Sequence, residues 1–331
     1  MKKLINGADD VVDEMLDGMA RAYPQYLRRL DGLDVVVRVG GSAGKVALVS
    51  GGGSGHEPAH GGYVGKGMLD AAVSGAVFTS PTPDQVYEAI LAANGGRGVL
   101  LVIKNYTGDV MNFEMAADMA RDEGIEVEQV IVADDVAVEG STWTVGRRGI
   151  AGTVFVHKIA GACAEAGADL AEVRRVAQKV VENVRSMGMA LAACTVPSAG
   201  RPGFDLAEDE MEIGIGIHGE PGVAREPVAP ADDVVDELLE KILAEGIYGA
   251  GDEVAVMVNG MGATPLMELF VANRHLGEEL SARGIRVHRT MVGNYMTSLD
   301  MAGFSITLLK LDDELKALLD APCDTPALTQ A

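Results

Sequence analysis

The sequence predicts an α/β protein with two α/β domains, each built on a mainly parallel or mixed sheet with flanking helices. Short β-branched runs alternate with helical patterns through most of the chain, which is typical of sheets covered by helices on both faces. The chain has 331 residues, enough for about two domains of ~150 residues each. A stretch rich in proline, glycine and acidic residues at 195–210 separates two sets of elements. We therefore expect an N-terminal domain at 1–188 and a C-terminal domain at 189–331.

The N-terminal set of elements follows from apolar residues with a helical period and from β-branched runs. In a parallel sheet of this kind, functional residues lie on loops beyond the carboxyl ends of the strands. The predicted elements are a helix from Asp10 to Ala22, strands at 34–39 and 46–50, a helix at 84–94, a strand at 98–105, a helix at 110–123, a strand at 127–134 and a helix at 168–187.

The C-terminal set repeats the alternation of strands and helices after the proline- and glycine-rich stretch. It predicts a second sheet with its own helices. The expected elements are a strand at 211–217, a helix at 232–245, a strand at 253–258, a helix at 264–282 and strands near 285–292 and 304–310.

Charge and composition exclude several classes of function. The formal net charge is −22, and a field of that sign repels phosphate backbones and anionic membranes, so we expect neither nucleic-acid nor membrane binding. The three cysteines show no metal-ligand spacing, and an odd count without a secretory signal indicates a reducing compartment. No apolar run reaches 18 residues, so no transmembrane helix is predicted. These features together predict a cytoplasmic protein.

Two glycine-rich stretches resemble nucleotide-binding motifs but are better explained as loops. GGSAGKV at 40–46 has too few residues between its glycines for a P-loop and is read as a turn between strands. GIGIHG at 214–219 matches a dinucleotide fingerprint, which must open a helix, but the glycines and proline that follow extend a loop. What remains is His218, a histidine at the end of a strand on a sterically open, glycine-flanked site.

The stretch VSGGGSGHEPAH at 49–60 follows a strand directly. Its glycines leave backbone N–H groups free to face a ligand, and His56 is expected at the start of a helix. The same stretch contains HEPAH, which on a helix would place His56 and His60 on one face to bind zinc. Pro58 argues against this because proline fits only the first turn of a helix, and no third ligand is evident. A zinc hydrolase stays the less favoured alternative.

The stretch KNYTGDVMNFE at 104–114 ends a buried strand with a cation, an amide and a carboxylate in one loop. Asp109 could simply cap the helix that follows, a common use of aspartate. Lys104 and Asp109 together are more than a cap requires, so the loop is a candidate site.

Several motifs, taken in order, closely resemble the substrate-binding subunit of dihydroxyacetone kinase over essentially the whole chain. They are GGGSGHEPAH at 51–60, SGAVFTSPTPDQV at 74–86, IKNYTGDVMNFE at 103–114, GRRGIAGTVFVHKIAGA at 146–162, EIGIGIHGEPG at 212–222, VNGMGATPLMEL at 258–269 and GNYMTSLDMAGFSITLL at 293–309.

This resemblance implies a mechanism in which a ketone is held covalently. In the family, a histidine nitrogen adds to the C2 carbonyl of the substrate to give a hemiaminal, and the matching residue is His218. The resemblance gives His56 and Asp109 the hydrogen bonding and acid–base work, with Asp109 drawing the proton from the terminal hydroxyl. The catalytic residues implied are thus His218, His56 and Asp109, with no metal ligand. The implied substrate-binding set adds Gly53, Ser54, Gly55 and Lys104.

The resemblance also implies partners. In the family the nucleotide lies on a separate all-helical domain, which this sequence does not show before Ala331. It therefore implies a multi-subunit enzyme in which this chain binds no cofactor. A nucleotide-binding kinase subunit would hold ADP or ATP and Mg²⁺, and a carrier of the phosphoenolpyruvate phosphotransferase chain would rephosphorylate it. A homodimer is expected. The alternative is a regulator that binds dihydroxyacetone and acts through a transcription-factor partner.

Overall fold

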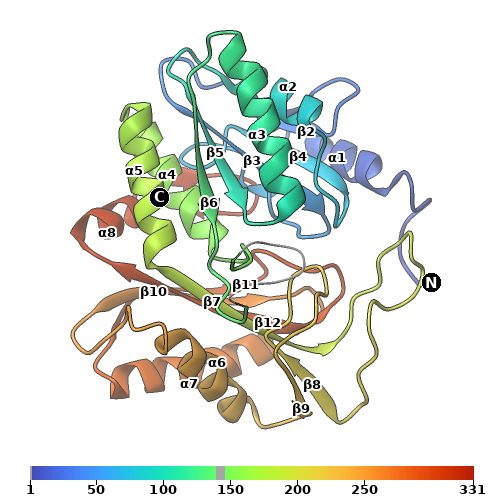
Figure 1. The fold of residues 1–331 in the computed structure, drawn as a ribbon, viewed down its shortest axis with the longest axis vertical. Coiled ribbons are helices and arrows are strands. Elements are labelled where there is room, and N and C mark those ends of the chain that lie inside the picture. The colour runs from blue at the N-terminus through green and yellow to red at the C-terminus, as the bar shows by residue number, and fades with distance from the viewer. Residues whose placement is uncertain (1, 139–145) are drawn as a thin grey trace.

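The computed structural model describes residues 2–138 and 146–331, and in this part of the chain two six-stranded sheets form the framework (Figure 1). The first sheet has the order β1-β2-β4-β3-β5-β6. Strands β4, β3, β5 and β6 are parallel to one another, β2 is antiparallel to β4, and β1 is antiparallel to β2. Its strands are β1 (Leu27–Arg29), β2 (Val35–Arg38), β3 (Ala47–Ser54), β4 (Ala71–Val77), β5 (Val99–Lys104) and β6 (Val127–Val132).

The second sheet is mostly antiparallel, with the order β11-β10-β12-β7-β8-β9 and one parallel pair, β10 with β11. Its strands are β7 (Val184–Ala192), β8 (Glu210–Ile213), β9 (Ala224–Pro227), β10 (Glu253–Gly260), β11 (Arg286–Gly293) and β12 (Ala302–Leu311). The predicted class, two mixed or mainly parallel sheets with flanking helices, is confirmed. Strand β7 spans residue 188, and the division of the chain at that residue stays a prediction.

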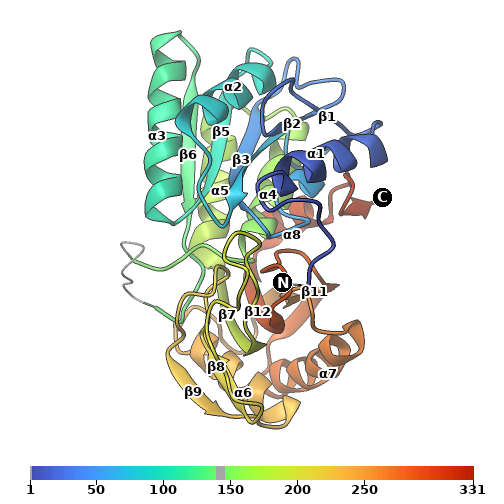
Figure 2. The ribbon, with the colours of Figure 1, turned by 90° about the vertical axis from the view of Figure 1, so that its right-hand side faces the viewer.

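The helices pack in layers around the two sheets (Figure 2). One face of the first sheet carries α2 (Pro83–Ala93) and α3 (Thr107–Asp122). Its other face carries α1 (Val11–Ala22), α4 (Thr153–Glu165) and α5 (Leu170–Asn183), and their apolar core continues onto the second sheet. The far face of the second sheet carries α6 (Ala231–Leu243) and α7 (Leu266–Ala282).

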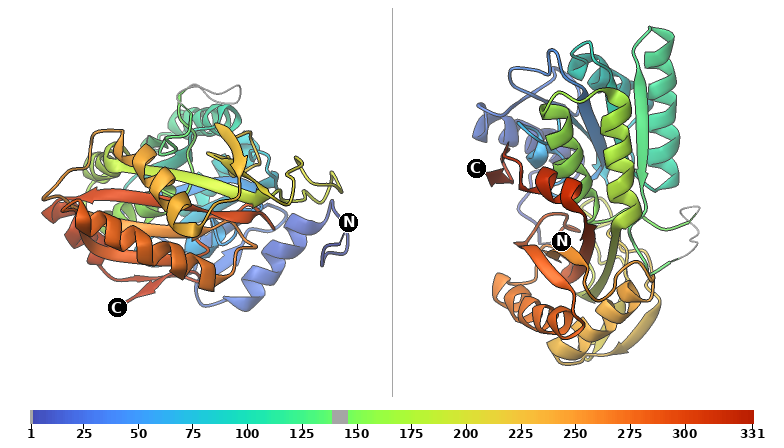
Figure 3. Two further views of the ribbon diagram at one scale, coloured as in Figure 1. Left: turned by 90° about the horizontal axis from the view of Figure 1, so that it is seen from below. Right: turned by 90° about the vertical axis from the view of Figure 1, so that its left-hand side faces the viewer.

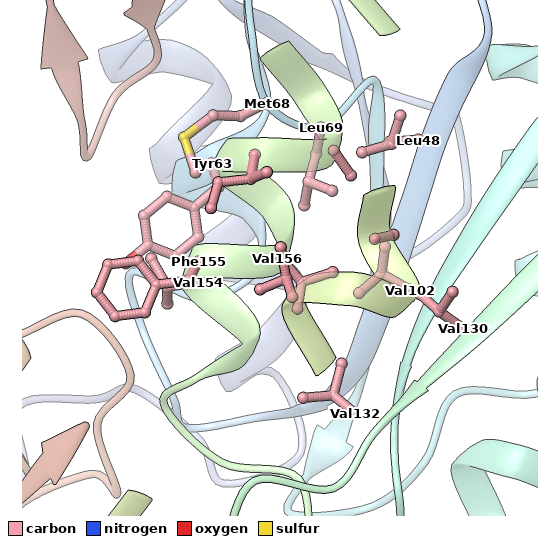
Figure 4. Packing of buried hydrophobic residues seen from close by; sticks show 14 of the residues in the cluster. Leu48, Tyr63, Met68, Leu69, Val102, Val130, Val132, Val154, Phe155 and Val156 are labelled. Carbon is pink, nitrogen blue, oxygen red and sulfur yellow. The ribbon is translucent and has the colours of Figure 1, made fainter. Parts of the chain in front are cut away.

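The strands of the first sheet carry apolar side chains on both faces, and both faces are buried. Successive side chains of a strand point to opposite faces. Leu48 and Val102 belong to the same buried cluster as Val156 of α4, and Figure 4 shows Leu48 beside Leu69. Their neighbours Val49 and Leu101 lie in the cluster under α2 and α3. A sheet covered in this way leaves only its strand ends free for a site.

The end of the chain returns to the first half of the molecule (Figure 3). After β12, helix α8 (Asp313–Asp320) packs on α4, and the short pair β13 (Cys323–Asp324) and β14 (Thr329–Gln330) follows. The backbones of Lys66 and Asp324 exchange two hydrogen bonds of 3.0 and 2.9 Å. This segment lies beside the 3₁₀ turn η1 (Gly61–Tyr63). The chain therefore passes from the first sheet to the second at the start of β7, and it returns to the first half after β12.

Three expectations about the elements are wrong. The helix predicted at 168–187 ends at Asn183, where the chain enters β7 and pairs with β12. The strand predicted at 211–217 ends at Ile213, because Gly214 takes a φ of 76° that turns the chain. No helix starts at His56, which lies in a bend after β3. In the part of the chain that the structure describes, no helix is long and apolar enough to cross a membrane.

Candidate functional site

A cavity of about 450 Å³ lies where the ends of β3 and β5 meet the loop after β8. Residues from three predicted motifs, far apart in the sequence, line it together. This is the edge of the first sheet at which a parallel fold presents functional loops. The lining residues are Gly53, Phe78, Ser80, Tyr106, Thr107, Gly108, Asp109, His218, Gly219, Glu220 and Pro221.

His218 is held by Glu220, two residues further along the loop. Nδ1 of His218 lies 2.9 Å from Oε1 of Glu220, and Oε2 accepts a 2.9 Å hydrogen bond from the His218 backbone N–H. Burial opposes ionisation of Glu220, but the hydrogen bond from His218 and the charge of Arg148 outweigh it and lower the pKa of Glu220 to about 2. An ionised carboxylate only accepts hydrogen bonds, so Nδ1 is the donor, and in the neutral tautomer with this donor the lone pair lies on Nε2.

Three rings surround the imidazole of His218. Its centroid lies 4.6 Å from the Tyr106 ring, 4.8 Å from the His56 ring and 5.2 Å from the Phe78 ring, all in edge-to-face arrangements. Phe78 also stacks on His56 at 5.1 Å. The His218 side chain is only 17% exposed. This ring cage leaves the imidazole little freedom to rotate, which favours a single orientation for chemistry.

His56 is fully buried and has one nitrogen without a partner. Its Nδ1 lies 2.7 Å from the carbonyl oxygen of Thr297, so Nδ1 donates and Nε2 is left as an acceptor. Within the described part of the chain, Nε2 has no hydrogen-bond partner. Burial and, to a lesser degree, the charge of Lys104 hold the pKa of His56 well below its usual value. His56 is therefore neutral and able to accept a proton or a hydrogen bond at the cavity.

Lys104 and Asp109 each carry a buried polar atom that lacks a hydrogen-bond partner among the described residues. Nζ of Lys104 and Oδ1 of Asp109 are buried, and neither has a hydrogen-bond partner in residues 2–138 and 146–331. Burial lowers the pKa of Lys104, while the charges of Asp109 and Glu220 oppose that shift. Gly52 makes room for Lys104, because a Cβ there would lie 2.6 Å from Nζ, and it lies next to Asp109, whose Oδ2 would be 3.5 Å from that Cβ. Asp109 lies in the first turn of α3, where a carboxylate interacts favourably with the helix dipole.

The three other predicted binding residues contribute differently. Gly53 lines the cavity, and a Cβ there would lie 2.5 Å from the backbone nitrogen of Thr79. The Ser54 hydroxyl donates to the carbonyl of Gly75 at 2.7 Å and so turns toward β4. The Gly55 N–H donates to the Glu57 side chain at 3.1 Å. A substrate role for Ser54 and Gly55 stays a prediction.

The zinc geometry that HEPAH would need is not formed, because residues 56–60 are not helical. Nδ1 of His60 lies 3.0 Å from Nε2 of His157 on α4, away from the Thr297 carbonyl that holds His56. Among the described residues, the group with metal-like spacing is Asp236, His275 and Glu279 on α6 and α7, which is partly exposed. It lies on a different layer from the cavity.

The comparison with protein families agrees with this geometry. The Dak1 domain model matches residues 17–327, nearly the whole chain. This chain belongs to the Dak1 domain family. The predicted family resemblance is therefore confirmed.

Relatives of this Dak1 chain are similar over its full length. A Listeria innocua protein, "PTS-dependent dihydroxyacetone kinase 1, dihydroxyacetone-binding subunit DhaK", is 57% identical over 99% of this chain and 100% of its own. The structure of the "dihydroxyacetone kinase operon co-activator Dha-DhaQ" is similar with a TM-score of 0.91 and 39% identity over 96% of this chain and 98% of its own. The dihydroxyacetone kinase of C. freundii, solved with AMP-PNP and Mg²⁺, matches with a TM-score of 0.90 and 39% identity over 99% of this chain and 61% of its own.

Of the eleven cavity residues of this Dak1 chain, only Gly53, Asp109 and His218 were predicted as site residues from the sequence. Those not predicted include Phe78, Tyr106 and Glu220. Tyr106 lies inside the KNYTGD loop and Glu220 two residues after His218, so both stand within motifs that were already singled out. Phe78 is in the resemblance motif at 74–86, but no local pattern indicates that its ring packs against two histidines.

Proposed function

We propose that this protein is the dihydroxyacetone-binding subunit of a phosphoenolpyruvate-dependent dihydroxyacetone kinase, a phosphotransferase that makes dihydroxyacetone phosphate. It holds the ketone on His218 and presents its terminal hydroxyl to a nucleotide-bearing partner. The L. innocua relative, 57% identical and of the same length, carries the name of that subunit. The cavity supports the proposal independently of the name.

The observation that carries the proposal is the set of unsatisfied buried atoms beside the cavity. Nε2 of His56 and Oδ1 of Asp109 accept hydrogen bonds, Nζ of Lys104 donates them, and none has a partner in the described part of the chain. Buried polar groups are rarely left unpaired, so such groups indicate a ligand. A small molecule with hydroxyl donors and a carbonyl acceptor matches this set, and a polyhydroxy ketone has both.

The covalent step uses the lone pair on Nε2 of His218. Nε2 adds to C2 of the ketone, the carbon–nitrogen bond forms and the carbonyl π bond breaks. The imidazole gives up its Nδ1 proton to Glu220, 2.9 Å away, which passes it to solvent, and the carbonyl oxygen takes up one proton from solvent. The hemiaminal is therefore neutral and the number of protons is unchanged. Polyols such as glycerol lack a carbonyl and cannot form this bond, which gives specificity that hydrogen bonds alone supply only weakly.

The transfer step places the terminal hydroxyl beside Asp109. Its carboxylate takes the hydroxyl proton as the oxygen attacks phosphorus, and Nε2 of His56 is the second acceptor. Positioning supplies most of the catalysis in phosphoryl transfer. In this proposal the nucleotide and Mg²⁺ belong to a kinase subunit, which a phosphotransferase-system carrier recharges, and this chain forms a homodimer.

A regulator is the second candidate because a co-activator shares this fold with 39% identity. A sensor could capture the ketone through His218 alone. The buried Lys104 and Asp109 favour catalysis, since Asp109 has a use only when a proton must leave the substrate. Turnover after mixing with a nucleotide-bearing partner and its phosphoryl donor would distinguish the two.

Native mass spectrometry of the purified chain tests the capture step. Wild type should gain one dihydroxyacetone per chain and no glycerol, and His218→Ala should gain neither. His288→Ala removes a histidine from β11, outside the cavity lining, and should behave as wild type. Undiminished capture by His218→Ala would refute the assignment of His218, and absence of any adduct in wild type would refute covalent binding.

A further inference from the structure

Arg148 is the largest fully buried side chain in the described part of the chain, and the mechanism above does not use it. It is 1% exposed. Its Nε donates to Oδ2 of Asp135 at 2.7 Å, and Nη2 lies 2.7 Å from the same oxygen. Asp135 is also 1% exposed. Ionic groups are costly to bury, and breaking such a pair leaves a buried charge unpaired, so this pair requires an explanation.

Arg148 also reaches the loop that carries His218. Nη2 donates a 2.8 Å hydrogen bond to the carbonyl of Gly214, the residue that ends β8 with its positive φ. Arg148 thus connects the segment after β6 to the first residue of the 214–220 loop. The contact fixes where that loop begins, four residues before the histidine.

Gly216 shows how closely Arg148 and Glu220 approach each other. A Cβ at Gly216 would lie 1.9 Å from Oε2 of Glu220 and 2.6 Å from Nη1 of Arg148. The two charged groups therefore face the same small space, which only a glycine leaves open. In a buried site an unscreened positive charge at this range favours the carboxylate form of its neighbour.

We propose that Arg148 is a positioning residue: by fixing the 214–220 loop and keeping Glu220 ionised, it holds the Nδ1 proton of His218 in place and keeps the lone pair on Nε2. This inference rests on the proposed capture of a ketone, which needs that lone pair. Lys104 is the other buried cation whose charge is coupled to Glu220, so the test must separate the two.

The test measures the tautomer of His218 directly, by ¹⁵N NMR of histidine-labelled protein without substrate, assigned with His218→Ala. The main variant, Arg148→Met with Asp135→Asn, removes both charges and leaves no unpaired ion, so we expect it to fold. Wild type should show a protonated Nδ1 and an unprotonated Nε2. The double variant should show mixed tautomers and about 10-fold weaker ketone capture, the usual size of an outer-contact effect.

Four further variants keep the proposal falsifiable if the double variant does not fold. Asp135→Asn and Arg148→Lys each retain the positive charge and should retain the wild-type tautomer, whereas Glu220→Gln should lose it. Lys104→Met should retain it if Arg148 is the controlling charge. An unchanged tautomer in the folded double variant, or a mixed one in Asp135→Asn, would overturn the role of Arg148. A wild-type chain with the expected tautomer but no ketone adduct would refute the proposed function and leave this role standing.

Discussion

The two sides of the site differ in whether their polar atoms have hydrogen-bond partners. The segments at the ends of β3 and β5 contribute His56, Lys104 and Asp109, each buried with one polar atom that has no hydrogen-bond partner among the described residues. The loop from the second sheet contributes His218, which is partly exposed and paired with Glu220. Unpaired buried groups lower the stability of the protein and can be satisfied by a bound ligand. A paired imidazole, in contrast, is already held in one orientation. In the proposed function, recognition and nucleophilic attack therefore come from different parts of the fold.

Loss of Asp109 should give the largest effect on turnover, and it tests the side of the site that carries the unpaired groups. Asp109→Asn removes the base but keeps the shape, so turnover in the reconstituted kinase should fall by about 10²–10⁴-fold while ketone capture persists. Asp84→Asn, in the first turn of α2, is the matched control. Unchanged turnover in a steady-state assay would leave Asp109 as a helix-terminal residue only.

His56→Asn should affect both binding and turnover, because in the proposed function Nε2 accepts a hydrogen bond or proton from the substrate, and because the ring packs against Phe78 and His218. We expect kcat/KM to fall by about 10–100-fold, with KM and kcat both changed. His275→Asn, on α7, should change neither. Kinetics equal to wild type would show that His56 acts only in packing.

Lys104→Met sharpens the comparison by separating stability from function. Removing a buried ammonium without a hydrogen-bond partner should raise the free energy of unfolding by about 1–3 kcal/mol, while affinity for the ketone falls. Urea unfolding and adduct titration measure the two effects. A loss of stability would instead mean that Asp109 needs the charge of Lys104 in the folded state.

The smallest predicted effect concerns pH. Burial and, after it, the charge of Lys104 lower the pKa of His157 to about 3. Below an unfolded pKa of ~6.5 the unfolded chain binds a proton at this residue that the folded chain does not. The protein therefore loses stability as pH falls from that value toward 3. His157→Gln should reduce the stability lost between pH 7.5 and 5.5 by about 1.4 kcal/mol, as measured by urea unfolding. An equal loss in both proteins would mean that His157 titrates normally.

The sequence predicted most strands and the three loops that meet at the cavity, because strand ends and glycine-rich turns leave local patterns. It missed α4, whose residues 153–164 are all buried and therefore show no amphipathic period. It also extended a helix into β7, where the apolar spacing continues past Asn183. The pairing of Arg148 with the loop at Gly214 joins residues 66 positions apart, which no local pattern reveals.

The return of the C-terminal segment to the first half has a consequence for how long a ketone stays bound. Many two-domain binding proteins trap a ligand by hinge bending. Here rotation of one sheet against the other would break the packing of α8 on α4 and the two hydrogen bonds between Lys66 and Asp324. We therefore expect the cavity mouth to keep its width, so that residence time is set by cleavage of the bond to His218. The lifetime of the complex would then be a chemical property, tunable by the imidazole and its neighbours, and not a mechanical one.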